Sequence, residues 1–258
     1  MDYQTITLEI ADDIAVVTLN RAEVMNALSS QMRAEITHAV TEGGKSARVV
    51  VITGTGRAFC SGQDLSDSAS VANPDLERIL RDEYLPMLRA IVDCPVPTIS
   101  AVNGAAAGAG ANLALAADVV IAADSAYFTQ AFTRIGLIPD AGGTWTLPRN
   151  MGMAKAMGAA LFAEKITAQQ ADAWGMIWEH VADAAFEATW KARAAHLAKG
   201  PTLAYRKAKE AIRATWENDL EAQLNVEGKA QGVCGQSRDF QEGVVAFLEK
   251  RPAHFEGR

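Results

Sequence analysis

The spacing of hydrophobic and polar positions divides this chain into two parts. In the first half, short apolar runs are separated by charged or glycine-rich segments, which is typical of strands and their turns. These runs predict strands at residues 6–10, 15–20, 48–53, 97–102, 119–123 and 127–128. Asp12 and Asp13 separate the first two runs and indicate a hairpin. The continuous apolar run at 48–53 is typical of a strand buried on both faces.

A helical period begins in the first half and dominates the chain after residue 142. Ser29 is placed to cap a helix that runs to about residue 40, and residues 74–92 predict another helix. Further helices are predicted at residues 154–162, 167–174, 182–199, 201–217, 220–233 and 237–248. The pattern therefore predicts an α/β core followed by a helical C-terminal third.

The run from residue 98 to 117 carries no formal charge, and twenty such residues are long enough to cross a bilayer. The run is mostly Ala and Gly, however, it contains Asn103 and Asn112, and Gly104 interrupts it. A short buried strand, a tight glycine turn and a closely packed helix at about 108–117 explain the run better. We therefore expect no membrane span.

Composition and charge narrow the function classes. The 258 residues are 49% hydrophobic and 21% charged, as in a globular protein of one large domain or of one domain with a smaller appendage. The net charge of −7 argues against nucleic acid or an anionic membrane as a partner. The three cysteines indicate neither disulfides nor zinc, and no metal site is expected. The first residues do not resemble a signal peptide, so a reducing cytoplasm is the expected compartment.

The candidate chemistry centres on Asp140. This residue follows Pro139 and precedes Gly142 and Gly143, so its carboxylate lies on a rigid corner whose small neighbours let a ligand approach. Such a carboxylate could serve as an acid or base. An Asp after Pro could equally cap the next helix or close an Asx turn. The residues alone leave both interpretations open.

Two glycine-rich segments upstream, at residues 60–65 and 103–110, could offer backbone N–H groups to a ligand oxygen. The second is neither a dinucleotide-binding fingerprint nor a phosphate loop, because the glycine spacing differs and no Lys-Ser/Thr pair follows. Close packing of a helix on a sheet is the simpler explanation of these glycines. If both turns face one carbonyl oxygen, they would form an oxyanion hole and support enolate chemistry.

Five segments together resemble the enoyl-CoA hydratase/isomerase (crotonase) superfamily, over essentially the whole chain. They are residues 21–28 (RAEVMNAL), 59–65 (FCSGQDL), 101–110 (AVNGAAAGAG), 142–144 (GGT) and 247–251 (FLEKR). Residues 131–140, 143–145, 174–178 and 255–258 are most similar to the ring-1,2-epoxyphenylacetyl-CoA isomerases of phenylacetate degradation within that superfamily. The resemblance implies an enzyme that acts on an acyl thioester of coenzyme A (CoA).

The fold implied by the resemblance is an α/β spiral of ββα units over residues 1–200, which holds the CoA-thioester site. A helical region, residues 201–258, is implied to join copies into a homotrimer or a dimer of trimers. No separate cofactor is implied, because coenzyme A is part of the substrate.

The resemblance also implies the site residues. The backbone N–H groups of Gln63 and Ala109 match the oxyanion donors, and Asp140 is the candidate base. Positions that hold or close over coenzyme A in the family are occupied by Val24, Ser61, Leu65, Phe247 and Lys250. The acyl pocket is expected to involve Asn112, Phe132, Tyr84, Leu85, Ile138 and Trp145. These walls fit aromatic and branched acyl groups alike.

Departures from the hydratase pattern indicate the reaction class. Hydratases of the family carry glutamates at the positions of Asn112 and Phe132, and neither Asn nor Phe can activate water or manage its proton. Asp140 is the only carboxylate left in the motif. One carboxylate suits an isomerase that moves a proton from one carbon to another, as in conversion of a 3-enoyl-CoA to the 2-enoyl-CoA. The resemblance adds 1,2-epoxyphenylacetyl-CoA, converted to oxepin-CoA. Asn112 is expected at most to orient substrate or hold a water.

Three alternatives remain. The first is an enoyl-CoA hydratase. The second is a relative of the 4-chlorobenzoyl-CoA dehalogenases, in which Asp140 would be the nucleophile, although that family carries a Trp at the position of Phe132 and a His in the helix at 75–92, which has none here. The third is a non-catalytic scaffold that binds CoA thioesters, which would be expected to have lost Asp140.

Overall fold

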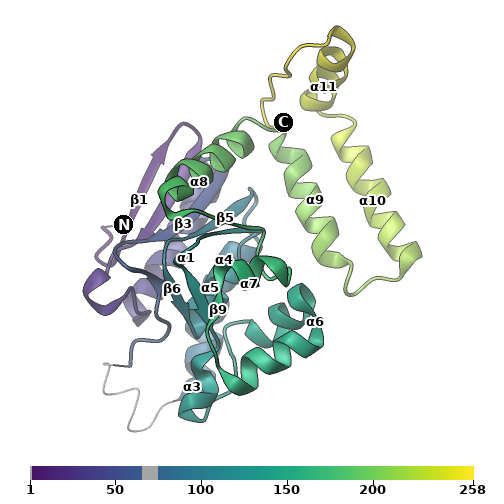
Figure 1. Ribbon diagram of the computed structural model, residues 1–258. Helices are drawn as coiled ribbons and strands as arrows, with labels where there is room; N and C mark the ends of the chain where they lie inside the picture. Colours follow the sequence, from purple (N-terminus) through teal and green to yellow (C-terminus); the bar gives the residue numbers. More distant parts are fainter. Residues whose placement is uncertain (1, 66–74) are drawn as a thin grey trace.

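The computed structural model describes residues 2–65 and 75–258, and its strands form two sheets (Figure 1). The larger sheet has six strands in the order β1 (Ile6–Ala11), β2 (Ile14–Leu19), β3 (Val49–Gly54), β5 (Thr98–Val102), β7 (Val119–Ala123) and β10 (Glu179–Val181). The smaller sheet has four, in the order β4 (Ala58–Cys60), β6 (Ala105–Ala107), β8 (Tyr127–Thr129) and β9 (Ile166–Thr167).

The chain alternates between the sheets as it advances. Each strand of the larger sheet from β3 to β7 is followed along the chain by a strand of the smaller sheet, in the pairs β3 and β4, β5 and β6, and β7 and β8. The strands β4, β6 and β8 pair in parallel, so their carboxyl ends lie at one edge. The chain leaves this edge at residues 61, 108 and 130. This arrangement confirms the expected α/β spiral.

All six predicted strands are confirmed, with bounds shifted by at most one residue. Asp12 and Asp13 form the hairpin turn with φ of 51° and 61°, the left-handed region that two-residue hairpin turns require. The strands β4, β6, β9 and β10 were not predicted. They have two or three residues each, which is too short to show a period of two.

The apolar core explains how such short strands persist. Phe59 in β4 and Phe128 in β8 are fully buried and belong to the same core cluster as Ile52 and Ile99 of the larger sheet. Burial of one such side chain contributes about 1.5–3 kcal/mol, comparable with two or three ladder hydrogen bonds at about 0.5–1.5 kcal/mol each. Side-chain packing and the ladder hydrogen bonds therefore hold the smaller sheet together.

The helices of the first half agree with the prediction in most respects. The helix α1 (Ser30–Ser46) is longer than predicted, and the Ser29 hydroxyl caps it by accepting from Met32 N at 3.2 Å. The predicted helix 74–92 begins at a residue outside the described part. It continues as α3 (Leu76–Ile79), a π-helical turn η2 (Leu80–Tyr84) and α4 (Leu85–Val92).

The uncharged run at 98–117 contains the expected strand, β5, and the expected helix, α5 (Ala109–Leu115), and the short strand β6 lies between them. Within the described residues, no helix has both the length and the apolar character that a membrane span requires. Short 3-10 helices, η1 (Ala22–Val24) and η3 (Ala131–Ile135), were not predicted.

The second half is helical, as predicted. Its helices are α6 (Gly143–Phe162), α7 (Ala168–Ala173), α8 (Asp183–Ala198), α9 (Thr202–Ala214), α10 (Leu220–Cys234) and α11 (Arg238–Glu249). The predicted helix 154–162 is only the second half of α6, which is kinked at Gly152 where φ is 76° and ψ is 161°. The helix α8 packs on strands of the larger sheet.

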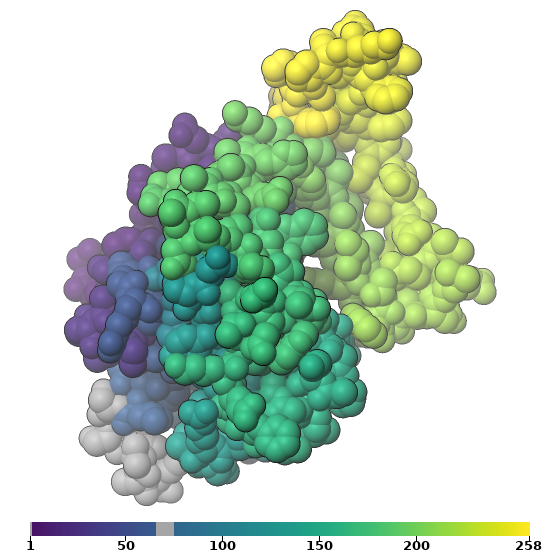
Figure 2. All heavy atoms as spheres, viewed as in Figure 1, coloured from purple at the N-terminus to yellow at the C-terminus, as the bar shows by residue number. Residues whose placement is uncertain are grey.

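The helices α9, α10 and α11 form an arm that stands out from the body of the molecule (Figures 1 and 2). Lys209 and Arg213 of α9 fasten its base, because each forms an ion pair of 2.7 Å with Asp118. Large apolar side chains are nevertheless exposed along the arm, among them Trp216, Leu220, Leu224, Phe240, Phe247 and Leu248. An exposed apolar surface of this extent is typical of an interface.

We predict that the arm is buried between copies of this chain, as a homotrimer or a dimer of trimers at micromolar concentration. Leu224→Asp should shift the protein toward a monomer, because it places a charge in an apolar interface. Light scattering measures the mass. Glu221→Gln, on the same helix, is the control and should leave the assembly unchanged. A stable wild-type monomer would contradict the prediction.

Candidate active site

The two glycine-rich segments meet at the carboxyl edge of the smaller sheet. Gly62 has a φ of 96°, and a Cβ there would lie 2.8 Å from the carbonyl oxygen of Ala107 and 3.4 Å from the nitrogen of Ala109. Gly108 has φ 53° and ψ −126°, which only glycine adopts without strain. The glycines thus allow close packing, and this packing places the turn at 61–63 against the start of α5.

The pairing of Leu28 determines where the N–H of Gln63 points. Leu28 N donates to the carbonyl of Gly62 at 2.7 Å, and the carbonyl of Leu28 accepts from Asp64 N at 3.2 Å. In a parallel bridge of this kind, the middle residue directs its own N–H to the opposite side. Among the described residues, the N–H groups of Gln63 and Ala109 have no hydrogen-bond acceptor. Both are available to a ligand oxygen.

The carboxylate of Asp140 is half-buried, and its Oδ1 atom has no hydrogen-bond partner among the described residues. Burial raises the pKa of Asp140 from 3.8 to about 6. The helix α6 is capped by Gly142 with no side-chain hydrogen bond, so Asp140 does not act as its N-cap. A carboxylate in this state suits a base that must both take up and release a proton.

Asn112 holds the backbone of Asp140. Its side chain is 2% exposed, and its Nδ2 atom donates to the carbonyl oxygen of Asp140 at 2.7 Å. Gln130, which is fully buried, donates from Nε2 to the Oδ1 atom of Asn112 at 2.9 Å and accepts from Asn112 Nδ2 at 3.3 Å. The side chain of Asn112 therefore has protein partners that the sequence analysis did not anticipate.

The expected acyl pocket has a buried part and an open part. Tyr84 and Phe132 are buried, and the Phe132 ring lies 3.7 Å from the position of a Cβ on Gly108. Leu85, Ile138 and Trp145 are 50%, 75% and 49% exposed, respectively. An apolar ligand would cover side chains that water contacts in the single chain.

The expected CoA residues fall into two groups. Val24 and Ser61 are brought together, because the Ser61 hydroxyl donates to the carbonyl of Val24 at 3.3 Å. Leu65 follows closely and is exposed. Phe247 and Lys250 lie on and directly after α11, which Figure 1 shows well apart from β6 and α5. A single chain in this conformation does not bring these two residues to the others.

The residues predicted from the sequence include neither Arg33 nor Gln130. Arg33 is 1% exposed and donates from Nη1 to the Oε1 atom of Gln63 at 2.9 Å. Its neighbours Met32 and Ile36 are also buried in α1. A cation on the apolar face of a predicted helix is therefore the feature of the sequence that could have indicated Arg33. Gln130 has no comparable signal, because it follows an ordinary strand.

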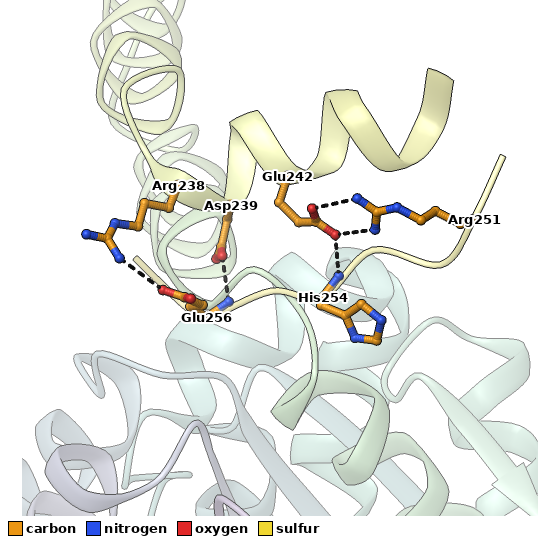
Figure 3. Close-up of a pocket in the computed structure, with 6 residues that line it drawn as sticks. All are labelled: Arg238, Asp239, Glu242, Arg251, His254 and Glu256. Atoms are coloured by element: carbon orange, nitrogen blue, oxygen red, sulfur yellow. Dashed lines mark hydrogen bonds and ion pairs between the residues drawn. The ribbon is translucent and has the colours of Figure 1, made fainter. Parts of the chain in front are cut away.

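A separate cavity of about 430 Å³ lies between α11 and the C-terminal tail (Figure 3). Its lining residues are Arg238, Asp239, Glu242, Arg251, His254 and Glu256. The charged side chains form ion pairs with one another or accept hydrogen bonds from backbone N–H groups. Arg251 forms ion-pair contacts of 2.7 and 2.9 Å with Glu242 and, together with the N–H of His254, lowers the pKa of Glu242 to about 2. The cavity lies away from Asp140, and its hydrogen bonds fasten the tail.

In the part of the chain that the structure describes, no group of three or more His, Cys, Asp or Glu side chains could hold a metal ion. The buried thiol of Cys60 lies beside the site, but burial raises its pKa to about 12. Cys60 is therefore not a nucleophile at neutral pH.

Comparisons with known proteins agree with this geometry. Residues 9–258 match the family model described as enoyl-CoA hydratase/isomerase. A protein of Rhodobacter capsulatus named "Probable enoyl-CoA hydratase" is 62% identical over 258 residues, which is 100% of both chains. The 1,2-epoxyphenylacetyl-CoA isomerase of Escherichia coli is 44% identical over 250 residues, 95% of each chain. The crystal structure of an enoyl-CoA hydratase from Bacillus anthracis, 33% identical, superposes with a TM-score of 0.93 over 99% of this chain and 100% of that one.

Asp140→Asn is predicted to stabilise the fold at neutral pH. Because burial raises the folded-state pKa of Asp140 from 3.8 to about 6, the wild type loses stability as the pH rises between these values and bears the full penalty above them. The neutral variant escapes this penalty. Its unfolding free energy should exceed that of the wild type by about 1–3 kcal/mol at pH ~7.5 and by little at pH ~4. Denaturant titration measures both, and an equal difference at the two pH values would contradict the assignment.

Proposed function

Because this chain belongs to the enoyl-CoA hydratase/isomerase family, we propose that it is an isomerase of acyl-CoA thioesters. The observation that carries the proposal is the state of Asp140. Its carboxylate is half-buried, its Oδ1 atom has no partner among the described residues, and its pKa is raised by burial to about 6. Asn112 and Phe132 occupy the positions where hydratases of the family carry their two glutamates.

The proposed reaction moves one proton. Asp140 takes a proton from the carbon next to the thioester carbonyl, and the electron pair of that C–H bond moves into an enolate. The N–H groups of Gln63 and Ala109 stabilise the negative oxygen, and such donors are worth about 3–4 kcal/mol each at the transition state. Protonated Asp140 then returns the proton two carbons further along, which converts a 3-enoyl thioester into the 2-enoyl thioester.

The second proposed substrate is 1,2-epoxyphenylacetyl-CoA, whose isomer is the oxepin. The support is the 44% identity to an isomerase with that name, together with a pocket whose expected walls include Tyr84, Phe132 and Trp145. Aromatic side chains suit a ring-containing acyl group. Ring expansion adds and removes no atoms, so a pocket that excludes water favours it over hydrolysis of the epoxide.

Coenzyme A is proposed to lie along Val24, Ser61 and Leu65. Phe247 and Lys250 would close over it, as expected from the family resemblance. Since α11 stands apart from these residues in a single chain, closure requires either movement of α11 or the α11 of a second copy.

Hydration is the second candidate, because the relative with 62% identity carries a hydratase name. The side chain of Asn112 opposes it, since both ends bond to Gln130 and Asp140 and leave little to orient a water. The dehalogenase alternative lacks its histidine in residues 75–92. A scaffold that only binds would gain stability by replacing Asp140, so the retained carboxylate argues for catalysis.

We predict that the wild type isomerises a 3-enoyl-CoA much faster than it hydrates crotonyl-CoA. The physical reason is that hydration needs one group for the water and another for the proton, and the site offers one carboxylate. Initial rates on a panel of fatty-acyl and phenylacetyl-type thioesters measure both activities. A crotonyl-CoA hydration rate comparable with the isomerisation rate would reverse the assignment in favour of a hydratase.

Asp140→Asn should lower kcat by about 10²–10⁴-fold with little change in thioester binding, since the amide cannot accept the proton. In the wild type, kcat should fall as the pH drops through about 6, because the base must be ionised. Asn112→Ala should cost about 10-fold and keep this pH dependence, because Asn112 positions Asp140 without carrying a proton. Near-normal turnover by Asp140→Asn would show that another group is the base.

A further inference from the structure

We propose that Arg33 is a positioning residue of the oxyanion hole. Together with Tyr84, it fixes the side chain of Gln63 and thereby the direction of the Gln63 N–H. The inference rests on the proposed function, in which this N–H stabilises the enolate oxygen.

Arg33 joins the two backbone segments that form the hole. Its Nη1 atom donates to the carbonyl of Leu28 at 2.7 Å and to the Oε1 atom of Gln63 at 2.9 Å. Leu28 is the residue that bridges both neighbours of Gln63. One guanidinium nitrogen therefore links the bridging strand to the side chain of the donor residue.

Tyr84 fixes the same side chain from the other side. Its hydroxyl donates to the Oε1 atom of Gln63 at 2.6 Å, and the guanidinium carbon of Arg33 lies 4.7 Å from the centre of its ring. The Gln63 Oε1 atom thus accepts two hydrogen bonds, which uses its full capacity. The Gln63 side chain has one arrangement that satisfies both donors.

These contacts act on the oxyanion donor through the peptide plane. Gly62 O and Gln63 N belong to one rigid unit. Leu28 N holds this unit at the Gly62 oxygen, and the tethered side chain of Gln63 holds it at the nitrogen end. The N–H direction is then fixed before substrate binds, and such preorganisation is what makes an oxyanion hole effective.

Burial of the Arg33 cation is unfavourable for folding by itself. Arg33 is 1% exposed, and a buried cation is unfavourable unless it is paired and fully hydrogen-bonded. Glu83 supplies the opposite charge through Nε and Nη2 of Arg33, and the Ser30 hydroxyl accepts from Nη2 at 3.0 Å. An apolar side chain would fill this position more simply. A fully paired, buried Arg33 that bonds to the side chain of Gln63 therefore points to a role in the site.

The test compares Arg33→Lys and Tyr84→Phe with Tyr3→Phe. Lys keeps the charge opposite Glu83 but cannot reach Leu28, Gln63 and Glu83 together, and Phe removes only the Tyr84 hydroxyl. Tyr3→Phe removes a hydroxyl that bonds to His38 on the same helix α1, at 2.8 Å, and is the matched control. Thermal unfolding verifies that each variant is folded.

Two readouts separate positioning from folding. We expect kcat on whichever thioester the wild type turns over to fall about 10–100-fold in Arg33→Lys and about 3–10-fold in Tyr84→Phe, with KM within about threefold of the wild-type value, since misaligned donors weaken the transition state most. We also expect the infrared carbonyl stretch of bound phenylacetyl-CoA, labelled with ¹³C at the carbonyl, to lose part of the downward shift seen in the wild type. Tyr3→Phe should match the wild type in both.

The outcomes separate this inference from the proposed function. Normal kcat and a normal carbonyl shift in Arg33→Lys and Tyr84→Phe would overturn the positioning role and leave the Asp140 mechanism intact. A wild type that turns over no thioester, yet shows the carbonyl shift and its loss in the variants, would overturn the proposed function while upholding the positioning of Gln63.

Discussion

The parallel pairing of β4, β6 and β8 is the constraint on which the rest of the structure depends. Three strands of three residues each end at one edge, and the segments that leave this edge carry Gln63, Ala109 and Phe132. So short a sheet is not stable by itself. Burial of Phe59 and Phe128 in the common core holds it, so the position of each N–H donor is ultimately set by apolar packing.

The polar groups around this edge are of two kinds, those with hydrogen-bond partners within the protein and those without. Arg33 bonds to Glu83 and Gln63, and Asn112 bonds to Gln130 and to the backbone of Asp140, so these polar side chains have partners within the protein. Asp140 and the two N–H donors are left for another molecule. A buried group without a partner is unfavourable by about 1–3 kcal/mol, so these groups reduce stability while the fully bonded ones around them keep their geometry. In the proposed reaction, the substrate would supply the partners that these groups lack.

The sequence predicts the frame of the fold better than the contacts within the site. Ser29, the Asp12–Asp13 turn and the apolar run at 48–53 are local signals, and the structure confirms each of them. The site depends on long-range pairings instead. Asn112 meets Gln130 across 18 residues, and Arg33 meets Gln63 across 30, so no local period could reveal either pair. The family resemblance points to Gln63, Ala109 and Asp140 as candidate site residues but not to the residues that hold them.

Two exposed tryptophans, one near Asp140 and one in the arm, lie on either side of Arg149. Trp145 is at the start of α6, next to the Asp140 turn, and the guanidinium of Arg149 lies 4.3 Å from the centre of its ring. The same guanidinium lies 5.5 Å from the ring of Trp216, just after α9. Arg149 therefore lies between the base of the arm and Trp145, which is expected to line the acyl pocket. Ion pairs with Asp118 hold α9 in place, and Arg48 donates to the carbonyl of Phe255 in the tail at 3.0 Å. If copies associate through the arm, as predicted, their interface therefore lies next to the side chains that are expected to line the acyl pocket.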